Sequence, residues 1–143
     1  MKIKFLGAAR EVTGSKVLIT TDEGKKILID CGMFQGKGLE TDGMNRNIGL
    51  EPSELHHIIL SHAHIDHSGL LPRLAVMGFR GPIYATPASI DLLEVLLPDA
   101  AHIQEKESEW QLRHQQRHGK GRQVRVTAPL YTVAQAQTTL QLL

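Results

Sequence analysis

Three histidines and an aspartate occupy four of the six positions from residue 62 to residue 67, in the stretch SHAHIDHSG. His62 and His64 are two residues apart, so on extended backbone both side chains leave the same side, with Cα atoms about 6.5 Å apart. Asp66 and His67 add a carboxylate and an imidazole further along the chain. Imidazole nitrogen and carboxylate oxygen bind zinc and similar ions at about 2.0–2.2 Å. The spacing therefore predicts two ligand pairs and two adjacent metal ions.

The ligand types favour a catalytic metal site over a structural one. Structural zinc sites are closed tetrahedra that are usually rich in cysteine, and Cys31 is the only cysteine in the chain. A mixture of nitrogen and oxygen ligands is typical of an open, catalytic site. The chain holds eight histidines, so some clustering by chance is expected. We interpret the other five as solvated or loosely packed: His56, His57, His102, His114 and His118.

The histidine cluster follows HHIIL (56–60), a short apolar run that we interpret as a buried strand. Ligand sites in α/β sheets collect beyond the carboxyl ends of strands, so the position suits a site. Earlier in the chain, strands are predicted over 2–7, 15–20 and 25–30. The last two form a hairpin around the TDEG turn, and residues 31–51 form a long irregular connection.

After the cluster, helices and strands alternate, which predicts an α/β layer. A helix is predicted from Gly69 to Gly78 with Pro72 in its first turn, followed by a strand over 82–86. Thr86 caps a helix that Pro98 interrupts, and a polar helix follows over 99–114. The last helix begins with a capping box formed by Thr132 and Gln135.

The bulk composition fits one soluble domain. The chain has 143 residues, of which 41% are hydrophobic and 22% charged. No apolar run approaches the roughly 20 residues that span a membrane, and no signal-peptide core follows Met1. We therefore predict a cytoplasmic protein with no membrane partner, and the single cysteine agrees with a reducing compartment.

Charge is distributed unevenly along the chain. Residues 1–109 carry 11 Lys or Arg against 15 Asp or Glu, whereas residues 110–143 carry five Lys or Arg and no acid. Residues 113–125 (RHQQRHGKGRQVR) hold all five of these basic residues around two glycines. They are interpreted as a loop between helices that is either simply solvated or able to contact phosphates.

The cluster SHAHIDHSG resembles the H-x-H-x-D-H signature of the metallo-β-lactamase superfamily. Other stretches are similar to its beta-CASP branch, which processes RNA and in some members DNA: FLGAAREVTGS (5–15), ILIDCGMFQG (27–36), SGLLPRL (68–74), PIYATPAS (82–89), LLPDAAHIQE (96–105) and PLYT (129–132).

This resemblance implies an αββα sandwich with two zinc ions at the sheet edge that activate water for attack on a phosphodiester. It assigns His62 and His64 to the first metal and Asp66 and His67 to the second. Asp30 matches the aspartate of the family's first motif, which orients ligands without binding metal. Asp30 and Asp66 are thus the expected catalytic carboxylates.

Family members continue for several hundred residues and supply a third-motif histidine, a bridging aspartate and a cap domain. We find no matching context for these groups, so residues 1–143 are expected to be a partial domain, the N-terminal half of the sandwich, with a mixed sheet and flanking helices. Each metal would then have two protein ligands, giving weak binding and little turnover. The uncovered apolar sheet face predicts self-association.

Three functions remain open. The first is a zinc-dependent ribonuclease or exonuclease part whose partner is RNA, with DNA as an alternative. The second is a non-catalytic module that binds metal or RNA. The third is another hydrolase of the same fold that acts on thioesters, lactones or sulfates, against which AAREVTGS (8–15) and LIDCGMFQG (28–36) speak.

Overall fold

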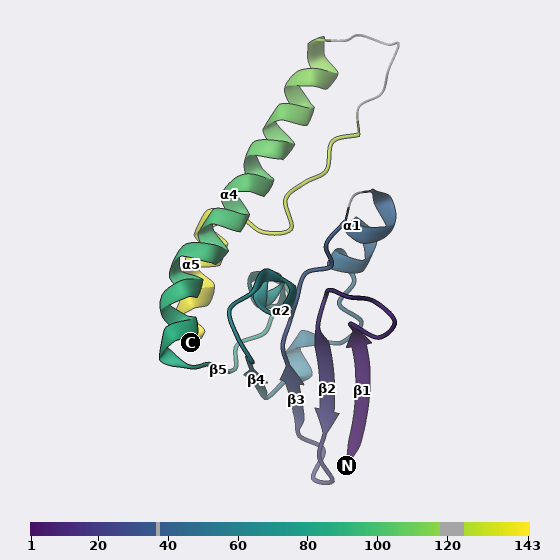
Figure 1. Cartoon of the computed structure of the whole chain (residues 1–143), viewed down its shortest axis with the longest axis vertical. Helices are drawn as coiled ribbons and strands as arrows, with labels where there is room; N and C mark the ends of the chain where they lie inside the picture. Colours follow the sequence, from purple (N-terminus) through teal and green to yellow (C-terminus); the bar gives the residue numbers. More distant parts are fainter. Residues whose placement is uncertain (37, 118–124) are drawn as a thin grey trace.

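The structure, a computed structural model, describes residues 1–36, 38–117 and 125–143. Five strands form one mixed sheet in the order β1-β2-β3-β4-β5 (Figure 1). Their bounds are Lys2–Gly7 for β1, Lys16–Thr20 for β2, Lys26–Ile29 for β3, His57–Ile59 for β4 and Ile83–Tyr84 for β5. The pairs β1/β2 and β2/β3 are antiparallel, whereas β3/β4 and β4/β5 are parallel.

Helices connect and flank these strands. They are α1 (Leu39–Arg46), α2 (Ile65–Ser68), α3 (Leu71–Val76), α4 (Pro87–Arg117) and α5 (Val133–Thr139), with short 3-10 helices at Pro52–Glu54 and Leu140–Leu142. The predicted fold class, a mixed sheet with flanking helices, is confirmed. Figure 1 shows α4 and α5 beside β5, while the second half of α4 extends well beyond the sheet.

One face of the sheet is covered. Side chains alternate between the two faces of a strand, and paired residues point to the same face. Leu28, Ile58 and Ile83 are such neighbours, and all three are buried. They belong to one core together with residues of α3, α4 and α5. This packing fixes the position of β4, whose end leads into the histidine cluster.

The other face is apolar and uncovered. The register places one row of side chains across it, apolar except for one histidine: Ile3, Phe5, Val17, Ile19, Ile27, Ile29, His57, Ile59 and Tyr84. Phe5 is 66% exposed, Tyr84 54%, Ile3 52% and Ile59 45%. We call this row the open face of the sheet. Contiguous apolar surface of this kind usually marks an interaction site.

The prediction of an irregular connection over 31–51 is wrong in part, because α1 lies within it. Asp42 and Arg46 form an i,i+4 ion pair at 2.9 Å that favours this short helix. Asn45 binds both the amide (2.8 Å) and the carbonyl (3.0 Å) of Phe34. These tertiary contacts, which local periodicity does not report, hold α1 in place.

The predicted break at Pro98 is also wrong, because α4 continues through it as a single helix of 31 residues. Proline removes one backbone donor and disfavours a helix interior. Leu93, Leu97 and Ala101 are fully buried at successive four-residue intervals on either side of Pro98. Burial of this continuous stripe outweighs the local penalty.

The basic segment predicted as a loop over 113–125 divides into parts. Residues 113–117 are the last residues of α4, so the loop prediction is wrong for them. Residues 118–124 lie outside the described residues.

Other local predictions are confirmed. The β2/β3 hairpin forms around residues 21–24, and α3 starts at Leu71 with Pro72 in its first turn. Both hydrogen bonds of the capping box between Thr132 and Gln135 are present at the start of α5. Among the described helices, none combines the length and the apolar character that crossing a membrane requires.

Candidate metal centre

The four predicted ligands lie where β4 ends and α2 begins. His62 and His64 belong to the loop after β4, whereas Asp66 and His67 are the second and third residues of α2. The short helix α2 was missed from sequence, so the second ligand pair lies on a helical turn. Asp30 directly follows β3, the parallel neighbour of β4. The carboxyl ends of parallel strands meet at one sheet edge, which brings Asp30 to the cluster.

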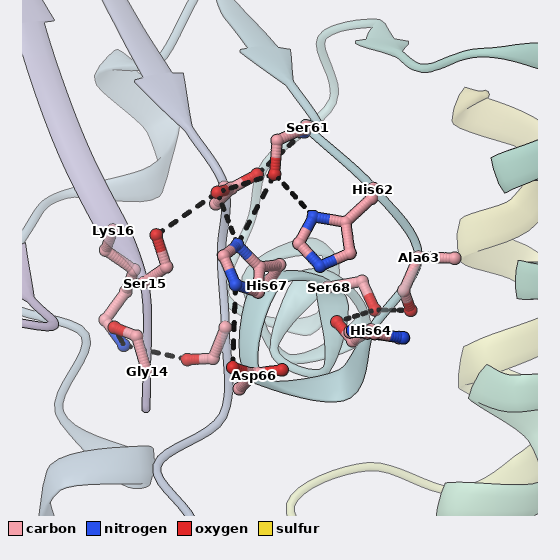
Figure 2. Close-up of polar contacts among 12 residues, drawn as sticks. Gly14, Ser15, Lys16, Ser61, His62, Ala63, His64, Asp66, His67 and Ser68 are labelled. Carbon is pink, nitrogen blue, oxygen red and sulfur yellow. Dashed lines mark hydrogen bonds and ion pairs between the residues drawn. The ribbon is translucent and has the colours of Figure 1, made fainter. Parts of the chain in front are cut away.

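The structure brings the three imidazoles together. The ring centroids of His62 and His67 are 4.0 Å apart, and those of His62 and His64 are 4.7 Å apart. The Asp66 carboxylate lies on the other side of His67, with Oδ2 3.5 Å from Nε2 (Figure 2). Two ligands of one tetrahedral ion at about 2.0–2.1 Å are themselves about 3.4 Å apart. The Asp66 and His67 atoms therefore have the separation that a shared metal ion requires.

Asp30 accepts hydrogen bonds from three segments of the chain. Its Oδ1 accepts from the Ser61 amide at 2.8 Å, and its Oδ2 accepts from the hydroxyls of Ser61 (3.0 Å) and Ser15 (3.1 Å). Oδ2 also lies 2.8 Å from Nδ1 of His67. The residue is 4% exposed, and its φ of 57° turns the chain at the end of β3. Aspartate is one of the few residues that tolerate this conformation.

These contacts indicate which nitrogen of each ring is available to a metal. An ionised Asp30 only accepts, so Nδ1 of His67 donates to it and Nε2 keeps a lone pair. Ser61 gives its one proton to Asp30, so its oxygen accepts from Nδ1 of His62 at 3.0 Å (Figure 2). Asp30 thus contacts His67 directly and His62 through Ser61, an arrangement that would leave both Nε2 atoms available to a metal.

Backbone contacts attach α2 to the end of β3. The Cys31 amide donates to the His67 carbonyl at 2.7 Å, and the Ser15 amide donates to the Asp66 carbonyl at 2.8 Å. At Gly32 a Cβ would come within 1.6 Å of the Asp66 carbonyl oxygen, so only glycine fits this close approach. The ligand-bearing turn is therefore fixed by its main chain as well as by its side chains.

A buried lysine joins the two loops around this turn. Nζ of Lys16 donates to the carbonyls of Gly14 (3.1 Å) and Gly32 (2.8 Å), and it lies 4.2 Å from the centroid of the Phe34 ring. Burial lowers the pKa of Lys16. Burial also raises the pKa of the neighbouring Cys31 to about 12, so this thiol is neutral at physiological pH. Cys31 is fully buried in the core.

Among the residues that the structure describes, no three His, Cys, Asp or Glu side chains are arranged to hold one ion. The four predicted ligands form two pairs, and a pair supplies fewer than three ligands to one ion. His102 and His114 lie on α4, outside the cluster. His57 lies within β4 and contacts Tyr84, with ring centroids 5.8 Å apart.

Sequence reasoning missed three residues of the site: Ser15, Lys16 and Ser61. Only Ser61 carried a signal, since it directly precedes His62. Ser15 reaches Asp30 across 15 positions and Lys16 reaches Gly32 across 16, so no local spacing reports these contacts.

Comparison with known families gives one match. The family model described as the metallo-beta-lactamase superfamily matches residues 10–76. A metallo-β-lactamase from Cronobacter sakazakii overlays with a TM-score of 0.47 at 26% identity, covering 64% of this chain and 31% of that chain. An overlap of that extent carries no argument on its own.

Curated relatives match over a longer stretch. Ribonuclease TTHA0252 of Thermus thermophilus is 46% identical over 106 residues, which cover 74% of this chain and 24% of the relative. Probable RNase MJ4 of Methanocaldococcus jannaschii is 41% identical over 108 residues, with 76% and 24% covered. Transcription termination factor FttA of the same organism is 36% identical over 109 residues, with 75% and 17% covered. The chain thus spans a quarter or less of the length of these relatives.

Proposed function

Because the chain belongs to the metallo-β-lactamase superfamily, and within it to the beta-CASP branch, we propose that the cluster at 62–67 is the metal-binding part of a hydrolase that cleaves phosphodiester bonds in RNA. Two of the relatives are named as ribonucleases, which supports RNA as the substrate class. DNA is the alternative substrate. The third function, hydrolysis of thioesters, lactones or sulfates, has no support among these relatives.

The observation that carries the proposal is the placement of His67 between two carboxylates. Asp30 lies 2.8 Å from Nδ1 and Asp66 lies 3.5 Å from Nε2. A carboxylate on one ring nitrogen and a ligand-range oxygen beside the other is the arrangement that prepares histidine for metal binding. A histidine that is hydrogen-bonded only for stability would need just one of these two carboxylates.

The donor set fits two divalent ions, for which we propose zinc. His62 and His64 would hold one ion, and Asp66 and His67 would hold the other. Such ions, when bound, lower the pKa of water and stabilise charge on the attacked phosphate. The chain's own contribution is orientation, because Asp30 and Ser61 fix which nitrogens face the ions.

Two protein ligands per ion mean weak binding and slow or no turnover by this chain, whose 143 residues we treat as a partial catalytic domain. A specific observation therefore favours a second candidate, a module that binds metal or RNA without hydrolysis. That observation is the lack of any three convergent ligand side chains among the described residues. Metal binding is common to both candidates, whereas chelator-sensitive turnover belongs to the first alone.

We also propose that the chain self-associates through the open face of the sheet. The face holds four apolar side chains that are 45–66% exposed. A second copy can cover an identical apolar face by symmetry, as most homodimers do.

Zinc titration tests the proposed site. Zinc added to the chain in competition with a chromophoric chelator should bind, and Asp66→Asn with His67→Ala should remove one class of site. His62→Ala with His64→Ala should remove the other. His102→Ala on the exposed side of α4 is the matched control and should leave zinc binding unchanged.

Zinc binding that survives substitution of all four ligands would refute the site. The same samples, incubated with a short RNA, separate the two candidates. Slow cleavage that stops on chelation and in Asp66→Asn supports the hydrolase. Zinc binding with no cleavage at any metal concentration supports the non-catalytic module.

A further inference from the structure

The last turns of α4 carry an aromatic pair in which Trp110 is exposed and His114 is half-buried. Trp110 and His114 stack with ring centroids 4.1 Å apart and an interplanar angle of 30°. Trp110 is the only tryptophan of the chain and is 55% exposed. This part of α4 extends beyond the sheet (Figure 1). An exposed aromatic ring offers a flat surface on which a ligand can stack.

Two guanidinium groups share the helix face of this pair. Trp110, Arg113, His114 and Arg117 occupy positions i, i+3, i+4 and i+7, which lie on one side of a helix. The Arg113 side chain is 65% exposed, and Arg117 is exposed as well. We call these four residues the α4 stripe.

Another side of α4 holds the returning chain. The Gln104 side chain accepts from the Leu130 amide at 2.9 Å, and the Gln111 side chain accepts from the Thr127 amide at 2.7 Å. At about 100° per residue, both glutamines lie roughly 100–120° around the helix from Trp110. The α4 stripe is thus not the surface on which residues 125–131 pack.

The charge along the stripe is positive, and two carboxylates precede it. From residue 110 onward the sequence has five Lys or Arg and no acid. Glu107 is exposed three residues before Trp110. Glu109 pairs with Lys106 at 3.1 Å and Arg113 at 3.2 Å. The hydrogen bond from Lys106, and then the charges of Lys106 and Arg113, lower the pKa of Glu109. Glu109 therefore stays ionised and offsets part of the charge of Arg113.

We propose that the α4 stripe binds single-stranded nucleic acid, with a base stacked on Trp110 and phosphates contacting Arg113 and Arg117. Aromatic side chains stack on bases of any sequence, and guanidinium groups bind phosphate through paired donors. The choice of RNA as the ligand rests on the proposed function. Binding at the α4 stripe itself does not, because no metal ion takes part in it.

Charge selects nucleic acid over a protein partner. An apolar protein surface would cover Trp110 but would leave the guanidinium groups of Arg113 and Arg117 without partners. A single strand supplies both a stacking surface and phosphates in regular succession. The stripe is also separate from the proposed metal ligands, which lie in the loop after β4 and on α2.

Trp110 provides its own reporter. In the presence of a chelator, an oligoadenylate of about eight nucleotides should quench the fluorescence of Trp110. An abasic oligomer of equal length has the same charge and no bases, so it should quench little and bind more weakly. Equal binding and quenching by both oligomers would show that charge alone acts and would overturn the stacking site.

Variants locate the site through the anisotropy of a labelled oligoadenylate. Trp110→Ala should weaken binding roughly tenfold, and Trp110→Phe should restore most of it. Leu112→Ala is the matched control, since Leu112 is also exposed but lies on another side of α4. Circular dichroism checks that α4 remains helical in each variant.

Substitutions at Arg113 and Glu109 should change the affinity for the oligonucleotide in opposite directions. Arg113→Gln should weaken binding and reduce the slope of log affinity against log salt by about 0.7. Glu109→Gln should strengthen binding, because Arg113 loses its competing partner. Lys25→Gln removes one positive charge in the distant β2/β3 hairpin and should change neither.

The outcomes distinguish the two proposals. Metal-independent binding that is lost in Trp110→Ala supports the α4 stripe even where zinc titration fails. Zinc binding without any oligonucleotide-dependent change at Trp110 overturns the stripe and leaves the metal site standing. Binding that is equally sensitive to Leu112→Ala and Trp110→Ala would also overturn it.

Discussion

Asp30 connects three parts of the chain through one carboxylate. It accepts from Ser15 after the first loop, from Ser61 after β4 and from His67 on α2. Because it is buried and fully engaged, its effect on a metal would be indirect and would act through ring orientation. The orientation of His62 depends on it as well, since Ser61 relays the contact.

Asp30→Asn removes the carboxylate charge while keeping a residue that suits the backbone turn. Asparagine tolerates a φ of 57°, so the turn after β3 should persist. The amide loses one acceptor oxygen, and the fixed donor role of Nδ1 in His67 is lost with it. We expect zinc affinity to fall roughly 10- to 100-fold, measured by chelator competition. The free energy of unfolding in urea should change less than it does in Asp30→Ala.

Asp30→Ala should lose the same affinity and a further 1–3 kcal/mol, roughly, of folding free energy, because the Ser61 amide loses its acceptor. Asp22→Asn, at an exposed aspartate in the hairpin turn, is the charge-matched control and should alter neither quantity. Unchanged zinc affinity in Asp30→Asn would show that Asp30 has only a structural role.

At the residue scale, the spacing of His62, His64 and Asp66 predicts a ligand set, which stays a prediction, and it does not predict the contacts that orient the side chains. The structure brings the rings of His62 and His64 within 4.7 Å of each other and Asp66 beside His67. The contact between Ser61 and Asp30 joins residues 31 positions apart. Such a contact depends on the parallel pairing of β3 and β4, which local patterns do not specify.

At the scale of elements, the site depends on how closely α2 approaches the end of β3. Gly32 sets that distance, because its missing side chain leaves room for the Asp66 carbonyl. Gly32→Ala should force the two segments apart and lower the free energy of unfolding by roughly 1–3 kcal/mol. Zinc affinity should fall with it, since the ligand turn moves. Urea unfolding and chelator competition measure the two effects.

Gly43→Ala is the matched control for this prediction. Gly43 lies within α1, and a Cβ there would meet nothing within 4 Å. Alanine is favoured over glycine in a helix, so stability should rise by about 0.5–1 kcal/mol without a change in zinc affinity. A Gly32→Ala variant as stable as Gly43→Ala would contradict the packing described for α2.

Element boundaries show where sequence patterns fail. Pro98 predicts a break, yet the buried stripe of Leu93, Leu97 and Ala101 carries α4 through it. Residues 31–51 lack periodicity, yet Asn45 fixes α1 against the backbone of Phe34. In both cases tertiary packing overrides a correct local preference. Capping signals at Thr86 and Thr132 succeed because they act within one turn.

At the scale of the whole molecule, the sheet has one face covered by helices and one open face. The covered face packs on α3, α4 and α5, whereas Phe5 and Tyr84 remain more than half exposed on the other. Alternation along β1 to β3 predicts two faces, and the uncovered one was predicted from the family resemblance. Which residues line it followed only from the strand register.

Self-association through the open face has a direct test in sedimentation velocity. The mass of the chain should rise with concentration across the micromolar range, because a stable interface buries about 800 Å² per partner and the open face is an extended apolar surface. Phe5→Lys and Tyr84→Lys place a charge at either side of the face and should each shift the dimer toward monomer at least tenfold. Val12→Lys is the matched control: Val12 is 94% exposed in the loop after β1, off the face, and its substitution should leave association unchanged. A chain that stays monomeric at every concentration, or a dimer insensitive to both face variants, would contradict the interface.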